Sequence, residues 1–191
     1  MDKESLTLAL HDYISFTKNN DYKSIVNSLY SGLFKLVPKD ALLEMMKESF
    51  ENDPVTDYID TFSIHSTSDI FEIDKHYFSK VEYHIELKVD RNEDVLTKIL
   101  NDESIDYNQH DKDMQSQIDI MLGLLKIKFG EEQVKYDPDK DEFRVWQLNT
   151  MLAIFENEEW KFVRWMTGSM YKRIFPERTV KKLATRFFLM D

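Results

Sequence analysis

The sequence predicts an α+β fold in which N-terminal helices pack on a curved, cone-like antiparallel sheet and a further helix follows at the C-terminus. Three observations support this prediction. Apolar residues recur at helical spacing in residues 1–52, they alternate at strand spacing in residues 57–90, and residues 142–166 contain two aromatic-rich runs on either side of an acidic turn. At 191 residues, the chain is expected to form a single domain, residues 1–191.

Residues 1–52 are expected to be helical. The first apolar stripe ends at Asn19-Asn20-Asp21, which supplies a break and a cap for the next helix. A second amphipathic helix is predicted over residues 25–37, and Pro38 begins a turn or the first turn of a third helix. The stripes that define the three helices are Leu6, Ala9, Leu10, Tyr13 and Ile14; Ile25, Val26, Leu29, Tyr30, Leu33, Phe34 and Val37; and Leu42, Leu43, Met45, Met46 and Phe50.

Residues 57–90 are expected to form strands, and residues 93–130 a helical excursion. Residues 77–89 alternate strictly between apolar and charged side chains, which predicts a strand with one buried face and one solvated face. Residues 90–113 are mostly acidic and polar, with one short helix expected. Residues 114–129 then carry a long helical stripe that ends before Gly130, a residue suited to the position that follows a helix.

Residues 132–166 are expected to return to strands. Residues 137–141 supply proline and aspartate for a hairpin turn, and the pattern lacks the glycine and glutamate that a calcium loop requires. The strand over residues 143–155 is apolar on both faces, so each face must be covered. Two solutions stay open: dimerisation through a sheet face, or a closed cone packed around its own side chains.

The net charge of −11 is unevenly placed. Residues 161–191 hold eight Lys and Arg against Glu177 and Asp191, a net charge of +6, so the first 160 residues carry −17. An acidic body disfavours binding to nucleic-acid phosphates. The basic C-terminal helix, expected over residues 176–188, is predicted to dock on its own domain or on a second copy, and a homodimer is the expected homo-oligomer.

The strands near the C-terminus resemble a known superfamily. The segment Met151-Leu-Ala-Ile-Phe-Glu156, followed by Glu159-Trp-Lys-Phe-Val163, is similar to the last two strands of the nuclear transport factor 2-like, or cystatin-like cone, proteins. The resemblance covers about 25 residues closely and the remainder only in architecture. It implies a curved sheet wrapped on helices, a conical cavity and frequent homodimers. Members include isomerases, cyclases, dehydratases and non-enzymatic binding domains, so the resemblance leaves the function open.

Composition narrows the functional classes. The chain has no cysteine, which excludes disulfides and thiolate chemistry and suits a reducing compartment. No signal peptide and no transmembrane run is expected, so the predicted location is the cytoplasm. Four scattered glycines exclude nucleotide-binding loops and a nucleophile elbow, and no cofactor is expected.

One acidic residue is a candidate for catalysis. Asp60 lies on the strand face expected to be buried, where an apolar environment would raise its pKa and make it a general base, with the hydroxyl of Tyr58 or Tyr83 as its partner. A solvated aspartate is the alternative. The predicted ligand pocket consists of Phe62, Trp146, Leu148 and Trp160, and Trp165 is expected in the core or an interface.

No metal site is expected. The acidic residues and His110 within residues 102–113 match no ligand spacing, and Asp111 or Asp113 more simply caps the helix that follows. The predicted function is therefore a soluble, non-enzymatic module that binds a small apolar ligand or another protein through an apolar cavity. The alternative is a cofactor-free lyase or isomerase that uses Asp60.

Overall fold

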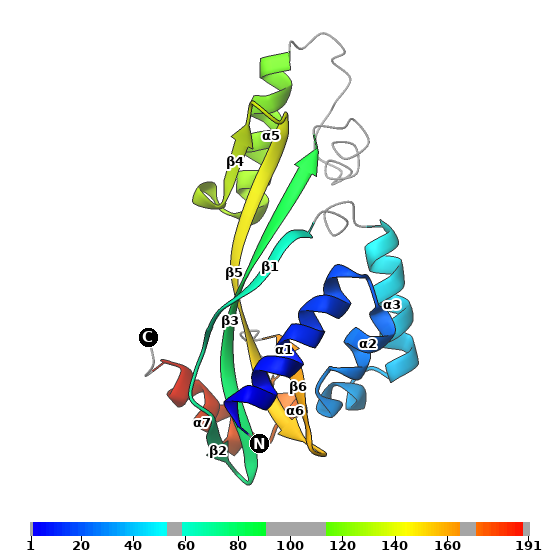
Figure 1. Cartoon of the computed structure of the whole chain (residues 1–191), viewed down its shortest axis with the longest axis vertical. Coiled ribbons are helices and arrows are strands. Elements are labelled where there is room, and N and C mark those ends of the chain that lie inside the picture. Colours follow the sequence, from blue (N-terminus) through cyan, green and yellow to red (C-terminus); the bar gives the residue numbers. More distant parts are fainter. Residues whose placement is uncertain (1, 53–58, 91–113, 165–170, 189–191) are drawn as a thin grey trace. The chain divides into compact units, whose positions relative to one another are not determined.

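The computed structural model describes residues 2–52, 59–90, 114–164 and 171–188, and it confirms the predicted α+β class (Figure 1). Helices come first, an antiparallel sheet follows, and the chain ends in a helix. The helices are α1 (Lys3–Lys18), α2 (Tyr22–Asn27), α3 (Lys39–Asn52), α5 (Met114–Phe129), α6 (Tyr171–Ile174) and α7 (Glu177–Phe188), with the 3₁₀ helices η1 (Ser31–Lys35) and η3 (Glu131–Gln133).

The described strands form one sheet in which β1, β3, β5 and β4 are neighbours in that order. The strands are β1 (Ile59–Thr67), β2 (Phe71–Ile73), β3 (His76–Asp90), β4 (Val134–Asp137), β5 (Glu142–Glu156) and β6 (Glu159–Arg164). Consecutive strands form three antiparallel hairpins, in which β2 pairs with β3, β4 with β5, and β5 with β6. Both predicted C-terminal hairpins are confirmed.

The chain divides into two compact units. Unit 1 contains residues 1–47, 63–83 and 149–191, and unit 2 contains residues 48–62 and 84–148. The strands β1, β3 and β5 each contribute residues to both units. The expectation of a single domain stays a prediction.

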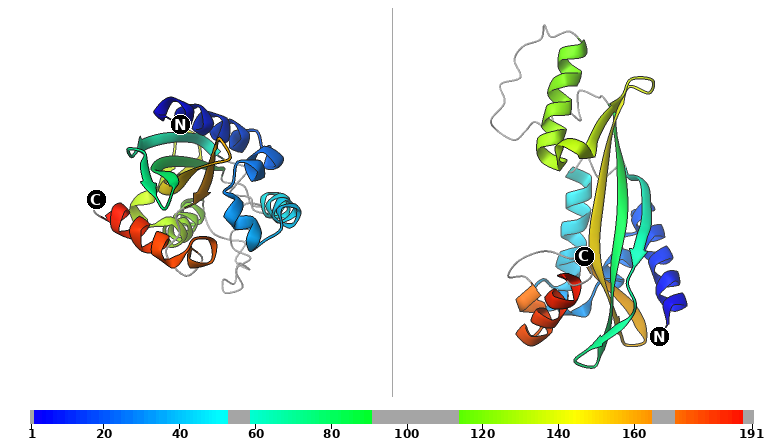
Figure 2. Two further views of the ribbon diagram at one scale, coloured as in Figure 1. Left: turned by 90° about the horizontal axis from the view of Figure 1, so that it is seen from below. Right: turned by 90° about the vertical axis from the view of Figure 1, so that its left-hand side faces the viewer.

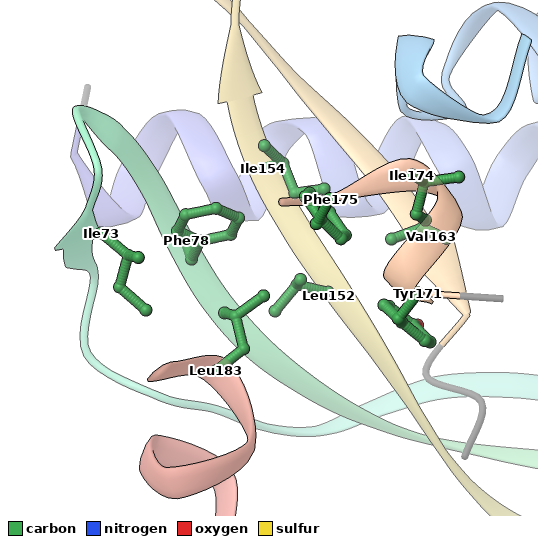
Figure 3. Close-up of a cluster of buried hydrophobic side chains, with 9 residues drawn as sticks. All are labelled: Ile73, Phe78, Leu152, Ile154, Val163, Tyr171, Ile174, Phe175 and Leu183. Atoms are coloured by element: carbon green, nitrogen blue, oxygen red, sulfur yellow. The ribbon is translucent and has the colours of Figure 1, made fainter. Parts of the chain in front are cut away.

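Unit 1 has an apolar core between the sheet and the C-terminal helices (Figure 3). The side chains of Leu152 and Ile154 on β5 and of Val163 on β6 are less than 7% exposed, and they face α6 and α7. The cluster consists of Ile73, Phe78, Leu152, Ile154, Val163, Tyr171, Ile174, Phe175 and Leu183. The amphipathic helix α7 is therefore attached through its apolar face, with Leu183 fully buried.

The opposite face of the same strands is covered by α1. Ala153 pairs with Phe162, and the Phe162 ring lies 5.0 Å from that of Tyr13 on α1. Figure 2 shows α1 and the pair α6–α7 on opposite sides of these strands. The part of β5 that belongs to unit 1 thus has both apolar faces covered, whereas Leu148, in the part that belongs to unit 2, is 55% exposed. The homodimer itself stays a prediction.

Unit 2 has its own core, in which α5 packs on β3, β4 and β5. Its buried members are Leu87, Val89, Ile118, Met121, Leu125, Val134, Phe143 and Val145. As predicted, α5 ends before Gly130, whose φ of 109° disfavours any other residue. The predicted turn at residues 137–141 is also confirmed, because Asp137 and Glu142 face each other across the β4–β5 hairpin.

The predicted helix over residues 25–37 is wrong from residue 28 onward. The helix α2 ends at Asn27 because the next residues pair with β6: the Phe162 amide donates to the Ser28 carbonyl, and the Tyr30 amide donates to the Phe162 carbonyl. After this parallel bridge the chain forms η1. Gly32 lies in η1, where a Cβ atom would be 2.3 Å from the Tyr30 ring, so any other residue would require that ring to move. The short helix α6 is not predicted by the sequence.

The basic helix α7 docks on its own unit through one carboxylate. Asp74, in the β2–β3 turn, accepts hydrogen bonds from the Thr179 hydroxyl at 2.9 Å and the Lys182 ammonium at 2.6 Å, and Arg178 lies 3.6 Å away. The hydrogen bond from Lys182, and to a smaller extent that from Thr179, holds the pKa of Asp74 below its ordinary value. Asp74 thus joins the β2–β3 turn to α7.

The Asp74→Asn variant is expected to be less stable than the wild type at neutral pH and to lose that difference in acid. A carboxyl with a depressed folded pKa stabilises the protein above its unfolded pKa of about 3.9, and this contribution disappears as the pH falls through the folded pKa. Urea unfolding of both proteins between pH 7 and pH 2 measures the difference. Glu72→Gln, an exposed carboxylate on β2, is the control. If the two proteins differed in free energy of unfolding by the same amount at every pH between 7 and 2, the stabilising role of the ionised Asp74 would be contradicted.

None of the helices within the described ranges combines the length and the apolar character that crossing a bilayer requires.

Candidate functional site

Unit 1 contains a groove between α1, α2 and the β5–β6 hairpin, with a volume of about 470 Å³. Helix α1 packs on both α2 and β6, so the groove follows the line where these elements meet. Figure 1 shows α1 and α2 next to β6. The lining residues are Ser5, Leu8, Ala9, Asp12, Phe16, Ser24, Asn27, Ser28, Phe155, Glu158, Glu159, Trp160, Lys161 and Phe162.

The aromatic part of the groove is fixed by Trp160. Its side chain is 5% exposed, its ring lies 5.3 Å from that of Phe155, and its indole N–H donates to the Ser5 hydroxyl at 3.1 Å. Ser5 is itself held by Asp2, which caps α1: the Ser5 amide donates to the Asp2 carboxylate, and the Ser5 hydroxyl accepts from the Asp2 amide. The start of α1 therefore orients the indole ring.

Exposed apolar and acidic groups also line the groove. Leu8 on α1 is 61% exposed although its side chain is large and apolar. Asp12 lies four residues further along α1, and Glu158 lies in the β5–β6 turn, where Asn157 and Glu158 both have positive φ. Within the described ranges neither Asp12 nor Glu158 forms an ion pair. The two carboxylates thus place uncompensated negative charge next to an apolar surface.

The one lysine of the groove does not offset these carboxylates. The Lys161 ammonium donates to the Glu159 carboxylate and, at 2.9 Å, to the Asn27 carbonyl. The hydrogen bond from Lys161 also holds the pKa of Glu159 below its ordinary value. Lys161 and Glu159 therefore neutralise each other, and the groove keeps the charge of Asp12 and Glu158.

The prediction that Asp60 lies on a buried strand face is wrong. Its carboxylate forms an ion pair with the Lys88 ammonium at 2.6 Å, and its side chain is 33% exposed. The hydrogen bond from Lys88 lowers the pKa of Asp60, whereas a general base in an apolar cavity would require a raised pKa. The cause is the pairing of β1 with β3, which places a lysine beside the aspartate.

Tyr58 and Tyr83 are the predicted catalytic partners of Asp60, and the structure does not test either pairing. Tyr58 lies outside the described residues. Tyr83 belongs to unit 1, whereas Asp60 belongs to unit 2. Tyr83 is 8% exposed, and its burial raises its pKa, an effect that the positive charge of Arg164 partly offsets.

Of the four residues predicted to form the ligand pocket, Trp160 lines the groove of unit 1, and the other three belong to unit 2. Phe62 is buried. Trp146 is half-buried, with the Lys135 ammonium 5.6 Å from its ring centre. Leu148 is 55% exposed, and its place in a ligand pocket stays a prediction. Trp165 lies outside the described residues.

Metal-ligand groups do not gather in the parts of the chain that the structure describes: no three His, Asp or Glu side chains there are placed to hold an ion. The acidic segment over residues 102–113 lies outside those parts.

Of the residues that line the groove, the sequence prediction named only Trp160 as a site residue, and those it missed include Leu8, Asp12 and Glu158. Leu8 could have been predicted as a surface contact residue, since it is large and apolar but lies outside the apolar stripe through which α1 packs. Asp12 and Glu158 carried none, because exposed carboxylates are common and 146 positions separate the two.

Comparison with known proteins gives no match to a family model, a curated protein or a solved structure. The resemblance to the nuclear transport factor 2-like superfamily accordingly stays a prediction.

Proposed function

We propose that this chain is a non-enzymatic protein-interaction module whose unit 1 groove receives a short basic and apolar segment of a partner protein. The observation that carries this proposal is the combination of exposed Leu8 and the aromatic pair Phe155–Trp160 with two unpaired carboxylates, Asp12 and Glu158. A segment with an apolar side chain and a lysine or arginine nearby complements both features.

A protein segment fits this groove better than a small molecule. Sites for small ligands usually enclose 70–90% or more of the ligand surface. Here Leu8, Asp12 and Glu158 are all exposed to solvent, which supports a groove open along its length. A peptide can lie along such a groove and make contacts on one side only. A small apolar ligand is the competing occupant.

The affinity is expected to be in the micromolar range or weaker. Burying one apolar anchor contributes about 1.5–3 kcal/mol, and an ion pair at an exposed site contributes about 0.2–1 kcal/mol. The loss of translational and rotational freedom on association offsets much of this gain. Such a module would act reversibly or as one of several contacts.

The lyase or isomerase alternative depended on a buried, weakly acidic Asp60. The ion pair with Lys88 instead lowers the pKa of Asp60, and we do not propose an enzymatic role for it.

The double variant Asp12→Asn/Glu158→Gln is expected to bind a basic amphipathic peptide about 2- to 30-fold more weakly than the wild type, since two exposed ion pairs are lost. The probe is a fluorescein-labelled leucine–lysine peptide, and fluorescence anisotropy measures its dissociation constant. Its leucine–glutamate counterpart is expected not to bind. Leu8→Ser tests the apolar contribution and is expected to weaken binding as well.

The matched control is Glu72→Gln, which removes an exposed carboxylate of unit 1 outside this groove. Its affinity is expected to equal that of the wild type. Equal binding of the two peptides, or an equal loss of affinity in the control and the groove variants, would contradict the proposal. Binding of an uncharged apolar dye in place of the leucine–lysine peptide would favour a small-ligand site.

A further inference from the structure

A second groove of unit 1 has the opposite charge. It lies between β2 and α7, has a volume of about 700 Å³, and is lined by Phe71, Glu72, Ile73, Lys181, Lys182, Thr185 and Arg186. The Arg186 guanidinium lies 5.4 Å from the centre of the Phe71 ring, a cation–π contact that leaves its charge available to a further partner. This β2–α7 groove thus combines an aromatic surface with three cationic side chains and a single carboxylate.

The three cations are not equally available. Lys182 is held by Asp74, the carboxylate that docks α7. Lys181 pairs with Glu177 one turn earlier, but both side chains are about 70% exposed, so the pair is weak. Arg186 forms no ion pair with the residues that the structure describes. Lys181 and Arg186 are therefore the groups with which the groove can bind an anionic surface.

Negative charge is concentrated in the other unit. Unit 1 contains 16 Lys and Arg against 15 Asp and Glu, whereas unit 2 contains 9 against 21 and so carries a net charge of −12. The exposed residues Glu131 and Glu132 form the 3₁₀ helix η3 just before β4, and neither has an ion pair among the described residues. They present two adjacent carboxylates on the surface of unit 2.

We propose that the β2–α7 groove of one copy binds the Glu131–Glu132 surface of a second copy, which makes the chain a homodimer. The argument is charge complementarity, because each copy carries a basic groove in unit 1 and an acidic surface in unit 2. The proposal takes the two contacts of the dimer to be related by two-fold symmetry. The β2–α7 groove and the peptide groove have no lining residue in common.

A contact of this kind depends strongly on salt. The screening length is about 10 Å at 0.1 M salt and about 3 Å at 1 M, so exposed charges attract each other much less in 1 M salt. The dissociation constant of the dimer is expected to rise about tenfold or more over this range. Analytical ultracentrifugation of the full chain at micromolar concentration measures this change.

A charge-exchange experiment tests which surfaces meet. The groove variant is Lys181→Glu/Arg186→Glu, which leaves the Lys182–Asp74 pair intact, and the acidic-surface variant is Glu131→Lys/Glu132→Lys. Each variant alone then presents two surfaces of like charge and is expected to be a monomer. An equal mixture of the two variants is expected to form the dimer again, because opposite charges meet in both contacts.

Lys23→Glu on α2 is the matched control, because it reverses an exposed charge of unit 1 outside the groove; it is expected to remain a dimer. Circular dichroism and urea unfolding verify that each variant is folded. If the groove variant misfolds, Lys181→Gln/Arg186→Gln replaces it in the measurement of the single variant, which is then expected to dimerise more weakly than the wild type. A wild type that is monomeric at low salt, variants that still form dimers alone, or a mixture that stays monomeric would each overturn the proposal.

Discussion

Replacing Phe162 with alanine is expected to lower the free energy of unfolding by about 3–5 kcal/mol, the range for a large aromatic residue removed from a core. Phe162 is 1% exposed, and its ring packs against Tyr13. Its backbone also holds the segment that follows α2 through hydrogen bonds with Ser28 and Tyr30. The cavity would therefore open where α1, α2 and β6 meet.

Chemical denaturation measures this loss, and hydrogen exchange locates it. Amides of α1 and α2 are expected to exchange faster in Phe162→Ala than in the wild type. The control is Leu8→Ala on α1, whose side chain is 61% exposed and whose loss is expected to change stability by no more than about 0.5 kcal/mol. Similar effects of the two substitutions would contradict the packing of α1 on the sheet.

Leu125→Ala is expected to have the second large effect, a loss of about 2–5 kcal/mol. The Leu125 side chain is fully buried between α5 and the strands of unit 2. Removing three carbon atoms from a packed core costs the transfer free energy of those atoms and leaves a cavity that the neighbours fill only in part.

The same helix supplies a matched control for this substitution. Ile127 lies two residues away on α5 and is 85% exposed, so Ile127→Ala is expected to change the free energy of unfolding by no more than about 0.5 kcal/mol. Urea unfolding monitored by circular dichroism gives both values. A larger loss in Ile127→Ala than in Leu125→Ala would show that α5 packs through its other face.

Features set by nearby residues could be predicted from the sequence. The β4–β5 turn needs only the Pro and Asp residues within positions 137–141, and the β5–β6 turn needs only polar residues that accept positive φ, such as Asn157. Gly130 marks the end of α5 for the same local reason. Hydrophobic periodicity likewise located α1 and β3, since each presents one apolar face.

Features set by distant residues could not be predicted. The apolar stripe of residues 25–37 fits a helix, but Phe162 competes for the backbone of Ser28 and Tyr30 from 132–134 positions away. The sequence predicted a buried Asp60 because the residues two positions before and after it, Tyr58 and Phe62, are aromatic. Only the pairing of β1 with β3 brings Lys88 next to Asp60. The groove that contains Leu8 requires α1 and the β5–β6 hairpin to be in place before it exists.

The double coverage of β5 has a consequence for aggregation. The run Met151-Leu-Ala-Ile-Phe155 has no charge, no proline and no glycine, which is the composition of segments that form cross-β fibrils. In the folded chain, α1 covers one face of this run, and α6 and α7 cover the other. Asp74 helps to hold α7 there, so acid that protonates Asp74 weakens one of the two covers. Storage and refolding in acid would therefore favour fibrils that begin at β5.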